Sequence, residues 1–291
     1  MDGILIVNKP KGWTSHDVVG KIRHIAQMKK VGHAGTLDPI ATGVLVVLLG
    51  KATKLSDILL QKDKTYRAGV RLGLTTDTYD ITGVVISQTE PEITKDEVDS
   101  VLRRFEGKQL QQPPMYSAVK QGGKKLYELA RQGIEVERPL REVEIYSIDR
   151  LDFASPSFTI EVHCSKGTYI RSLIHDIGQA MGSGACMESL CRTASGSFLL
   201  SDAVTVEQLS KDGVAPYLIP PQNILPVPEM TVDGEQERLI RNGNRICLLS
   251  ELKLGEQAEL KLFGENREFL CLAGVMRENG KQWVQPKIMF V

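Results

Sequence analysis

The stretch from Gly32 to Gly43 constrains the fold of this chain more than any other. Three glycines and one proline in twelve residues exclude a regular helix or a central strand and predict an irregular loop. The apolar run Val44–Leu49 follows at once, which predicts a buried strand. A loop pinned to a buried strand is a rigid platform, and Asp38 stands on it. Because Asp38 precedes a proline, its backbone is held extended or in a turn, and its carboxylate is presented at a fixed angle.

The totals of the chain are those of a globular protein. The 291 residues suffice for one large domain and a small one, and 42% of them are hydrophobic and 25% charged. The formal net charge is zero, but residues 1–75 hold 12 Lys and Arg against 5 Asp and Glu, whereas residues 76–111 hold 4 against 8. A basic face beside an acidic one is compatible with a partner that carries phosphates.

Several protein classes are disfavoured. Five cysteines, an odd number without a Cys-x-x-Cys pair, argue against a disulfide framework or a zinc ribbon. Reduced cysteines suit a cytoplasmic protein. The N-terminus lacks the apolar stretch of a signal peptide, and no apolar run is long enough to span a bilayer. We therefore expect a cytoplasmic protein with no membrane association.

Periodicity and turn signals predict the elements around the Asp38 loop. In the first half of the chain they are a strand at Gly3–Asn8, a helix capped by Thr14 or Ser15, a helix at Ala52–Leu60, a strand at Lys64–Gly73 and a helix after a capping box at Thr94. In the second half they are paired strands at Glu142–Phe153 and Ser157–Cys164, a helix at Ile170–Met181 and a strand at Leu190–Ser197. Five prolines in residues 216–228 predict a linker, followed by a small β-barrel-like module.

Local chemistry alone leaves the role of each polar residue open. Asp38 in a glycine-rich loop is first of all a turn residue, and Tyr66 is first of all a cross-strand packing aromatic. Lys9 is either part of a solvated turn or a phosphate contact. Arg171 would lie in the first turn of its helix, where a cation opposes the helix dipole. That position indicates an anion nearby.

Four separated strings change these interpretations. Asn8–Ser15, Gly32–Pro39, Lys64–Tyr66 and Gly167–Arg171 resemble, in order, motifs of the TruB family of pseudouridine synthases, which is related to the Cbf5/dyskerin branch. The resemblance implies an α+β catalytic domain over residues 1–228, built on a mixed, mainly antiparallel sheet. It also implies an RNA-clamping insertion over residues 108–141. A weaker similarity to the PUA RNA-binding domain covers the small β-barrel-like domain, residues 229–291.

The family resemblance implies an enzyme that isomerises the T-loop uridine of tRNA, position 55, to pseudouridine. The bond from ribose C1′ to uracil N1 breaks, the base rotates, and a bond from C1′ to C5 forms. No atoms enter or leave, so no metal, nucleotide or redox cofactor is required. The sequence also contains no Walker loop, dinucleotide fingerprint or zinc pattern. We expect a monomer that binds the tRNA T-arm without a guide RNA or a protein partner.

The same resemblance assigns roles to residues of the site. It makes Asp38 the essential carboxylate, paired bidentately with Arg171, which orients it and lowers its pKa. Tyr66 would stack on the flipped uracil and accept, itself or through a water, the proton that leaves C5. The remaining substrate contacts would come from His33 bracing the vacated space, Tyr169 and Leu190 walling the pocket, Asp80 bonding the base edge or Arg171, and Lys9 at a phosphate.

Two other readings of the sequence stay open. A non-catalytic RNA-binding protein would use the basic residues equally well but would not need Asp38, Tyr66 and Arg171 together. A guide-RNA-dependent synthase of the Cbf5 type would share the motifs, whereas the basic segment from Lys120 to Arg141 favours a stand-alone tRNA enzyme. The sequence also leaves open whether Asp38 attacks C6 of the uracil, attacks C1′ of the ribose, or removes the 2′ proton.

Overall fold

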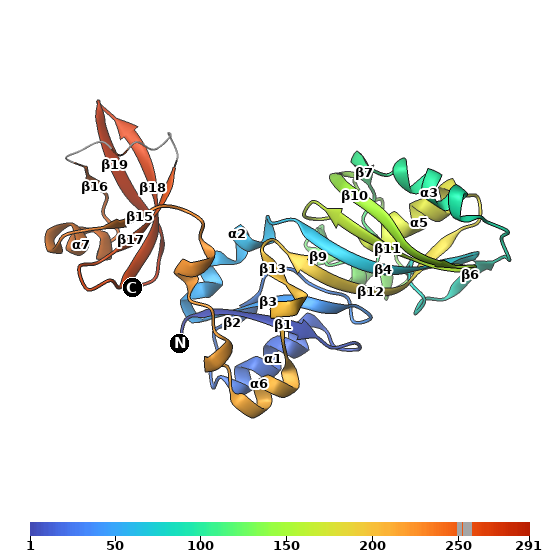
Figure 1. Ribbon diagram of the computed structural model, residues 1–291, viewed down its shortest axis with the longest axis horizontal. Helices are drawn as coiled ribbons and strands as arrows, with labels where there is room; N and C mark the ends of the chain where they lie inside the picture. Colours follow the sequence, from blue (N-terminus) through green and yellow to red (C-terminus); the bar gives the residue numbers. More distant parts are fainter. Residues whose placement is uncertain (249–251, 253–257) are drawn as a thin grey trace.

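A computed structural model describes residues 1–248, 252 and 258–291 of the chain. A ten-stranded sheet forms the larger part, with the strand order β14-β1-β3-β12-β4-β11-β10-β7; β2 pairs with β3, and β13 pairs with β12 (Figure 1). The β12–β3 and β1–β14 pairs are parallel and the other pairs are antiparallel, which confirms the predicted mixed, mainly antiparallel sheet. Its strands are β1 (Gly3–Lys9), β2 (Val31–His33), β3 (Thr42–Leu49), β4 (Lys64–Leu72), β7 (Gly107–Gln111), β10 (Arg141–Ala154), β11 (Ser157–Cys164), β12 (Ala185–Ser195), β13 (Phe198–Leu199) and β14 (Val204–Thr205).

Helices and two small hairpins complete this part of the molecule. The helices are α1 (Ser15–Ile25), α2 (Ser56–Leu60), α3 (Lys95–Arg103), α4 (Leu126–Ala130), α5 (Ile170–Ala180) and α6 (Val206–Asp212), with 3-10 turns η1 (Gly50–Leu55), η2 (Leu200–Asp202), η3 (Ala215–Tyr217) and η4 (Pro221–Ile224). The hairpins are β5 (Leu74–Thr76) with β6 (Val85–Gln88), and β8 (Lys120–Gln121) with β9 (Lys124–Lys125). None of the helices in the described residues is long and apolar enough to cross a bilayer.

The helices begin where their caps predict. Thr14 caps α1 and Thr94 caps α3, each accepting a hydrogen bond from the backbone N–H three residues on and each completing a capping box. The helix expected at Ala52–Leu60 is instead a 3-10 turn, η1, followed by the short α2. The strand expected from Leu190 begins five residues earlier, at Ala185.

Three apolar clusters fill the larger part of the molecule. One packs α3 and α5 against β4, β10 and β11, and another packs α1 and α6 against one face of β1 and β3. On the other face of β1 and β3, η1 and α2 share a cluster with Leu272 and Phe290 from the end of the chain. The loop that carries Asp38 lies between the two halves of the sheet, where β3 meets β12.

The C-terminal part is a five-stranded curled sheet with the order β15-β17-β18-β19-β16, beside one helix. Its elements are β15 (Glu229–Thr231), α7 (Gly234–Arg241), β16 (Ile246–Cys247), β17 (Glu259–Phe263), β18 (Phe269–Glu278) and β19 (Lys281–Met289). This agrees with the expected small β-barrel-like module. Lys51 and Lys54 of η1 donate hydrogen bonds to the carbonyls of Phe290 and Met289, both at 2.8 Å, so the two sheets are tied directly. Figure 1 shows the two chain ends near this junction.

The proline-rich segment expected as a linker is packed rather than free. Ile219 exchanges two backbone hydrogen bonds with Ile4 of β1, and Leu225 is buried in the cluster that η1 and α2 share. Prolines restrict the backbone of this segment, and its apolar side chains give it a surface on which to pack. The segment therefore lies packed on the surface of the larger part, anchored by Leu225.

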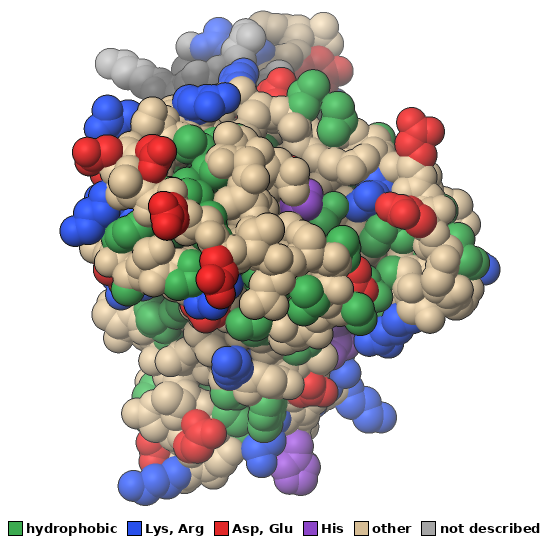
Figure 2. All heavy atoms as spheres, turned by 90° about the vertical axis from the view of Figure 1, so that its right-hand side faces the viewer, with side chains coloured by type: hydrophobic (Ala, Val, Ile, Leu, Met, Phe, Trp, Pro, Cys, Tyr) green, Lys and Arg blue, Asp and Glu red, His purple; other side chains and the backbone are tan. Residues whose placement is uncertain are grey.

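The end of the molecule that carries α3 and the β5–β6 hairpin is not basic. Val84 and Ile86 beside or within β6 are 71% and 68% exposed. Figure 2, which views the molecule from this side, shows apolar side chains scattered among both acidic and basic ones. This agrees with the excess of acidic residues between positions 76 and 111. A polyanion would find no continuous basic field here.

Candidate active site

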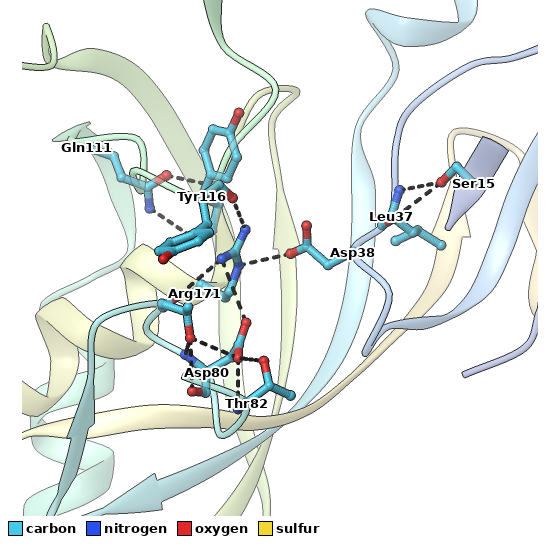
Figure 3. Close-up of polar contacts among 10 residues, drawn as sticks. Ser15, Leu37, Asp38, Asp80, Thr82, Gln111, Tyr116 and Arg171 are labelled. Atoms are coloured by element: carbon cyan, nitrogen blue, oxygen red, sulfur yellow. Dashed lines mark hydrogen bonds and ion pairs between the residues drawn. The ribbon is translucent and has the colours of Figure 1, made fainter. Parts of the chain in front are cut away.

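The loop that carries Asp38 is held from both sides by hydrogen bonds. β2 pairs with β3, and the N–H of Ala34 donates to the carbonyl of Val46 at 2.9 Å. On the other side, the buried hydroxyl of Ser15 accepts a hydrogen bond from the N–H of Leu37 at 2.9 Å (Figure 3). The first residues of the predicted loop are thus a strand, and the remainder is the fixed platform that the sequence predicts.

Lys9 also holds this loop. Its side chain is fully buried, and its ammonium donates to the carbonyls of Pro10, Trp13 and Pro39 at 3.0, 2.5 and 3.4 Å. Burial lowers the pKa of Lys9 to about 8. A phosphate cannot reach an ammonium with no exposed surface, so the structure contradicts the predicted phosphate contact. Carbonyls at the base of the loop need a donor, and Lys9 supplies it.

Arg192 is a further buried cation that sequence reasoning did not single out. Its side chain is 1% exposed; Nε donates to the carbonyl of Val44 at 2.6 Å and one terminal nitrogen donates to the carbonyl of Gly35 at 3.1 Å. It lies opposite Tyr66 in the β12–β4 register. The one available signal was a charged residue inside a predicted strand. Such a residue is rarely buried unless its charge is matched by hydrogen bonds.

Asp38 and Arg171 meet across the cleft between the loop and α5. Oδ2 of Asp38 lies 2.9 Å from Nε of Arg171, which is 4% exposed (Figure 3). The pair is not bidentate as predicted. The two terminal nitrogens of Arg171 are already used, since they donate to the carbonyls of Thr78 at 3.0 Å and Tyr116 at 2.7 Å. Two segments of the chain, one at Thr78 and one at Tyr116, thus fix the guanidinium, and its Nε edge faces Asp38.

Asp80 is the second carboxylate at this guanidinium. Its Oδ2 lies 3.7 Å from a terminal nitrogen of Arg171, and its Oδ1 accepts hydrogen bonds from the Thr78 hydroxyl and from the N–H and hydroxyl of Thr82. At 5% exposure, Asp80 has little surface left for a ligand. Of the two predicted roles, the structure supports the contact with Arg171 rather than with a base edge.

A cavity of about 290 Å³ opens beside the Asp38–Arg171 pair. Its wall includes the three predicted catalytic residues, Asp38, Tyr66 and Arg171, together with the predicted substrate contacts Tyr169 and Leu190. The full lining is Gly35, Thr36, Leu37, Asp38, Leu60, Lys64, Tyr66, Ser117, Ala118, Ser165, Gly167, Thr168, Tyr169, Ile170, Arg171, Leu190 and Arg192. About a third of the Asp38 side chain, 35%, remains accessible. The carboxylate is therefore open to a ligand while its partner is not.

The electrostatics of the cavity follow from burial. Burial raises the pKa of Asp38, the Arg171 guanidinium opposes this shift, and the negative charge of Asp80 adds to it. Burial also raises the pKa of Tyr66 and of Tyr169, which keeps both phenols protonated at neutral pH. The cavity therefore holds one ionisable carboxylate beside neutral aromatic groups.

The segment expected as an insertion, residues 108–141, contributes directly to the site. Tyr116 supplies a carbonyl to Arg171, and Ser117 lines the cavity. Gln111, 3% exposed, exchanges two hydrogen bonds with the backbone of Tyr169 at 2.7 and 3.1 Å, which fixes the start of α5 (Figure 3). Sequence reasoning missed Gln111 because a glutamine in a polar strand carries no signal of its own.

His33 does not line the Asp38 cavity. It faces a second hollow of about 470 Å³ on the other side of β2, together with Arg23, Lys29 and Lys30. Its ring lies edge-on to His16 with 5.6 Å between centroids, and burial lowers its pKa to about 4. His33, which was predicted to brace the base site, therefore does not contact the Asp38 cavity in this structure.

The sequence of this chain matches two family models over most of its larger part. Residues 23–170 match the model of the TruB family pseudouridylate synthase N-terminal domain, and residues 171–215 match the tRNA pseudouridylate synthase B C-terminal domain. The fold and the site define an RNA-modifying isomerase. The chain belongs to the TruB family of pseudouridylate synthases.

Curated relatives cover nearly the whole chain. The tRNA pseudouridine synthase B of Clostridium kluyveri is 44% identical over 264 residues, which are 90% of this chain and 91% of that protein. The protein of the same name from Dechloromonas aromatica is 46% identical over 270 residues, which are 91% and 90% of the two chains.

Solved structures of similar fold come from larger assemblies. A chain from an H/ACA RNP bound to a substrate RNA containing 2′-deoxyuridine is 26% identical, with a TM-score of 0.74 and coverage of 99% of this chain and 85% of that one. A chain from a Cbf5-Nop10-Gar1 complex is 28% identical, with the same TM-score and coverage. The similarity therefore extends over both sheets.

Proposed function

We propose that this chain isomerises the T-loop uridine of tRNA, position 55, to pseudouridine. The observation that carries the proposal is the Asp38–Arg171 pair at the wall of a cavity that also exposes Tyr66. Relatives named tRNA pseudouridine synthase B, 44% to 46% identical over nine tenths of the chain, support tRNA as the substrate. A cavity of about 290 Å³ lies at the small end of ligand sites, which suits a single base.

The target base must leave its stack to reach the cavity. Extrusion costs a few kcal/mol, less in a loop than in a duplex. Stacking on an aromatic ring such as Tyr66 returns about 1–3 kcal/mol per base. Because burial keeps the Tyr66 phenol protonated, a water that this phenol positions accepts the proton that leaves C5. Tyr169 and Leu190 enclose the base from the α5 and β12 sides.

Asp38 is the reactive group of the proposed mechanism. Its ionised carboxylate attacks C6 of the uracil, attacks C1′ of the ribose, or removes the 2′ proton; each route requires the same aspartate beside the same guanidinium. The C1′–N1 bond breaks, the base rotates and the C1′–C5 bond forms within one substrate. This isomerisation is balanced without a cofactor.

The chain is proposed to act alone on free tRNA as a monomer. The segment 108–141 carries six basic residues between Lys120 and Arg141 and joins the cavity wall at Tyr116, so it is placed to hold an RNA arm over the site. The PUA-like sheet from residue 229 onward offers a second RNA contact.

The direct test is conversion of an unmodified T-arm stem-loop transcript by the purified chain, with carbodiimide mapping because pseudouridine and uridine have equal mass. We expect pseudouridine at the position equivalent to 55 and nowhere else in the loop. Binding without conversion would support the non-catalytic reading, and conversion only after a guide RNA is added would support the Cbf5-type reading.

Activity should fall at acidic pH with a midpoint above the ordinary aspartate pKa. The folded-state pKa of Asp38 is raised from 3.8, and the reaction requires the ionised carboxylate, so the rate is lost as pH falls through the raised value. The measurement is the single-turnover rate on the stem-loop from about pH 4 to 8, with RNA binding followed at each pH. A rate that stays constant down to the lowest pH of this range would contradict the role of Asp38.

Two lysines at the second hollow should contribute to RNA affinity. In the described part of the chain Lys29 and Lys30 have no ion-pair partner, and they stand with Arg23 beside the strand that leads into the Asp38 loop. The double variant Lys29→Gln/Lys30→Gln should weaken tRNA binding and reduce the slope of log affinity against log salt by about 1.5.

The matched control removes two cations from the acidic part of the chain, through Lys95→Gln/Arg103→Gln on α3. Its affinity and salt slope should equal those of the unmodified chain. Equal slopes in both double variants would remove the second hollow from the RNA-binding surface, while leaving the proposed activity untouched.

A further inference from the structure

Besides Arg171, α5 carries a second side chain that contacts the β5–β6 loop. His175 follows Arg171 by one turn and therefore lies on the same side of the helix. Its ring stacks on the ring of Tyr79, with 4.0 Å between centroids and 16° between planes. Burial lowers the pKa of His175, so its imidazole is neutral at neutral pH. The motif strings of the sequence single out neither residue for this role.

Tyr79 stands between the two residues of its loop that contact Arg171. The loop between β5 and β6, residues 77–84, gives Arg171 the carbonyl of Thr78 at 3.0 Å and the carboxylate of Asp80 at 3.7 Å. Tyr79 itself has a φ of +63°, a conformation that a residue with a large side chain rarely adopts. A strained backbone persists only where its surroundings hold it.

Two kinds of contact hold Tyr79 in place. Its carbonyl accepts a hydrogen bond from the N–H of Met187 at 2.9 Å, and the N–H of Ile81 donates to the carbonyl of Met187 at 2.9 Å, which ties the loop to β12. The stacked ring of His175 ties the same loop to α5, the helix that carries Arg171. The stack therefore joins the loop that contacts Arg171 to the helix that carries Arg171.

We infer that the Tyr79–His175 stack is a positioning pair, which holds the β5–β6 loop against α5 and so aims the Arg171 guanidinium at Asp38. The inference rests on the proposed function, since it explains how the reactive pair keeps its geometry. Neither ring lines the cavity, so neither touches the substrate. Both act through Arg171.

The test replaces each ring and follows the acid midpoint of the single-turnover rate on the T-arm stem-loop. Three charged groups act on the Asp38 carboxylate: Arg171 of α5, Asp80 of the β5–β6 loop and Lys9 of β1. On the present inference, the positions of Arg171 and Asp80 depend on the stack. His175→Ala should slow conversion by about 2- to 10-fold, the range that an aromatic pair supplies. It should also move the acid midpoint to higher pH, because a misplaced guanidinium lowers the Asp38 pKa less. Binding of the RNA should not change.

Conservative variants separate positioning from general loss of stability. His175→Phe keeps an aromatic ring and should restore both the rate and the midpoint. Tyr79→Gly accepts the positive φ while it removes the ring, so it should reproduce the His175→Ala result, and Tyr79→Phe should not. Asp176→Asn, which removes a neighbouring half-buried acid of α5 with a pKa of about 6, should leave rate and midpoint unchanged.

Each other result overturns the inference. A slower His175→Ala enzyme with an unchanged midpoint would assign the stack to stability alone, and so would failure of His175→Phe to restore the rate. Variants as fast as the unmodified chain would show that the stack positions nothing. An unmodified chain that forms no pseudouridine would refute the proposed function instead, so the two failures are distinct.

Discussion

Replacement of Asp38 by asparagine should leave a folded protein that binds the T-arm RNA and forms no measurable pseudouridine. The amide keeps the shape of the side chain, so its oxygen can still lie beside Nε of Arg171 as the carboxylate does, but it can neither act as a nucleophile nor take up a proton. We expect the single-turnover rate to fall by at least about 10⁴-fold. Rate losses of this size are typical when one member of an interdependent set of catalytic residues is removed.

The same variant should be no less stable than the unmodified chain at neutral pH. The folded-state pKa of Asp38 is raised, so the folded protein binds more protons than the unfolded chain just above pH 3.8, and stability falls as pH rises through the raised value. An ionised Asp38 therefore costs stability at pH 7, and the amide removes that cost. Thermal melting at pH 7 measures the effect.

Asp99→Asn is the matched control for this substitution. Asp99 pairs with Arg150 through two contacts of 2.8 Å on α3 and β10, away from the cavity. It should lower the melting temperature slightly and leave conversion unchanged, the opposite pattern. Pseudouridine formed by the Asp38→Asn protein would refute the assignment of Asp38.

Arg171→Lys should be the second most damaging change. The guanidinium contacts the Asp38 carboxylate and the carbonyls of Thr78 and Tyr116 at once, and an ammonium on a flexible stem cannot reproduce this planar arrangement. The loss of a buried partner costs about 3–5 kcal/mol. A loss of this size in the transition state would lower the rate by roughly 10²- to 10⁴-fold.

Arg150→Lys controls for the loss of a guanidinium–carboxylate pair elsewhere in the chain. It breaks the paired contacts with Asp99 and should leave the rate intact. An Arg171→Lys enzyme with the rate of the unmodified chain would remove Arg171 from the site, even if its melting temperature were lower. The measurement is the single-turnover rate at saturating enzyme, so that weaker binding does not enter.

Local signals in the sequence predicted much of this fold. The cap at Thr14, the capping box at Thr94 and the alternation along β4 depend on neighbours in the chain, so they could be predicted without the structure. The start of β12 at Ala185 could not, because its first residues look like the end of a helix–turn segment and become a strand by pairing with β4. Tertiary pairing decides such positions.

The candidate site divides in the same way. The family resemblance pointed to Asp38, Tyr66, Tyr169, Arg171 and Leu190, and the structure brings all five to one cavity. It could not reveal that Arg171 is held by backbone carbonyls, since a carbonyl leaves no trace in the sequence. Lys9 was misread for a related reason: a lysine in a turn signals exposure, whereas its burial depends on three carbonyls that converge only in the fold.

The hydrogen bonds from the lysines of η1 to the end of the chain bear on the length of RNA that could contact both sheets. Lys51 and Lys54 grip the backbone at Phe290 and Met289, and Phe290 sits in an apolar cluster with β1 and β3. The distance from the Asp38 carboxylate to the C-terminal sheet is therefore fixed by packing and not by a flexible linker. An RNA that engages both ends gains avidity only if its stem has the matching length.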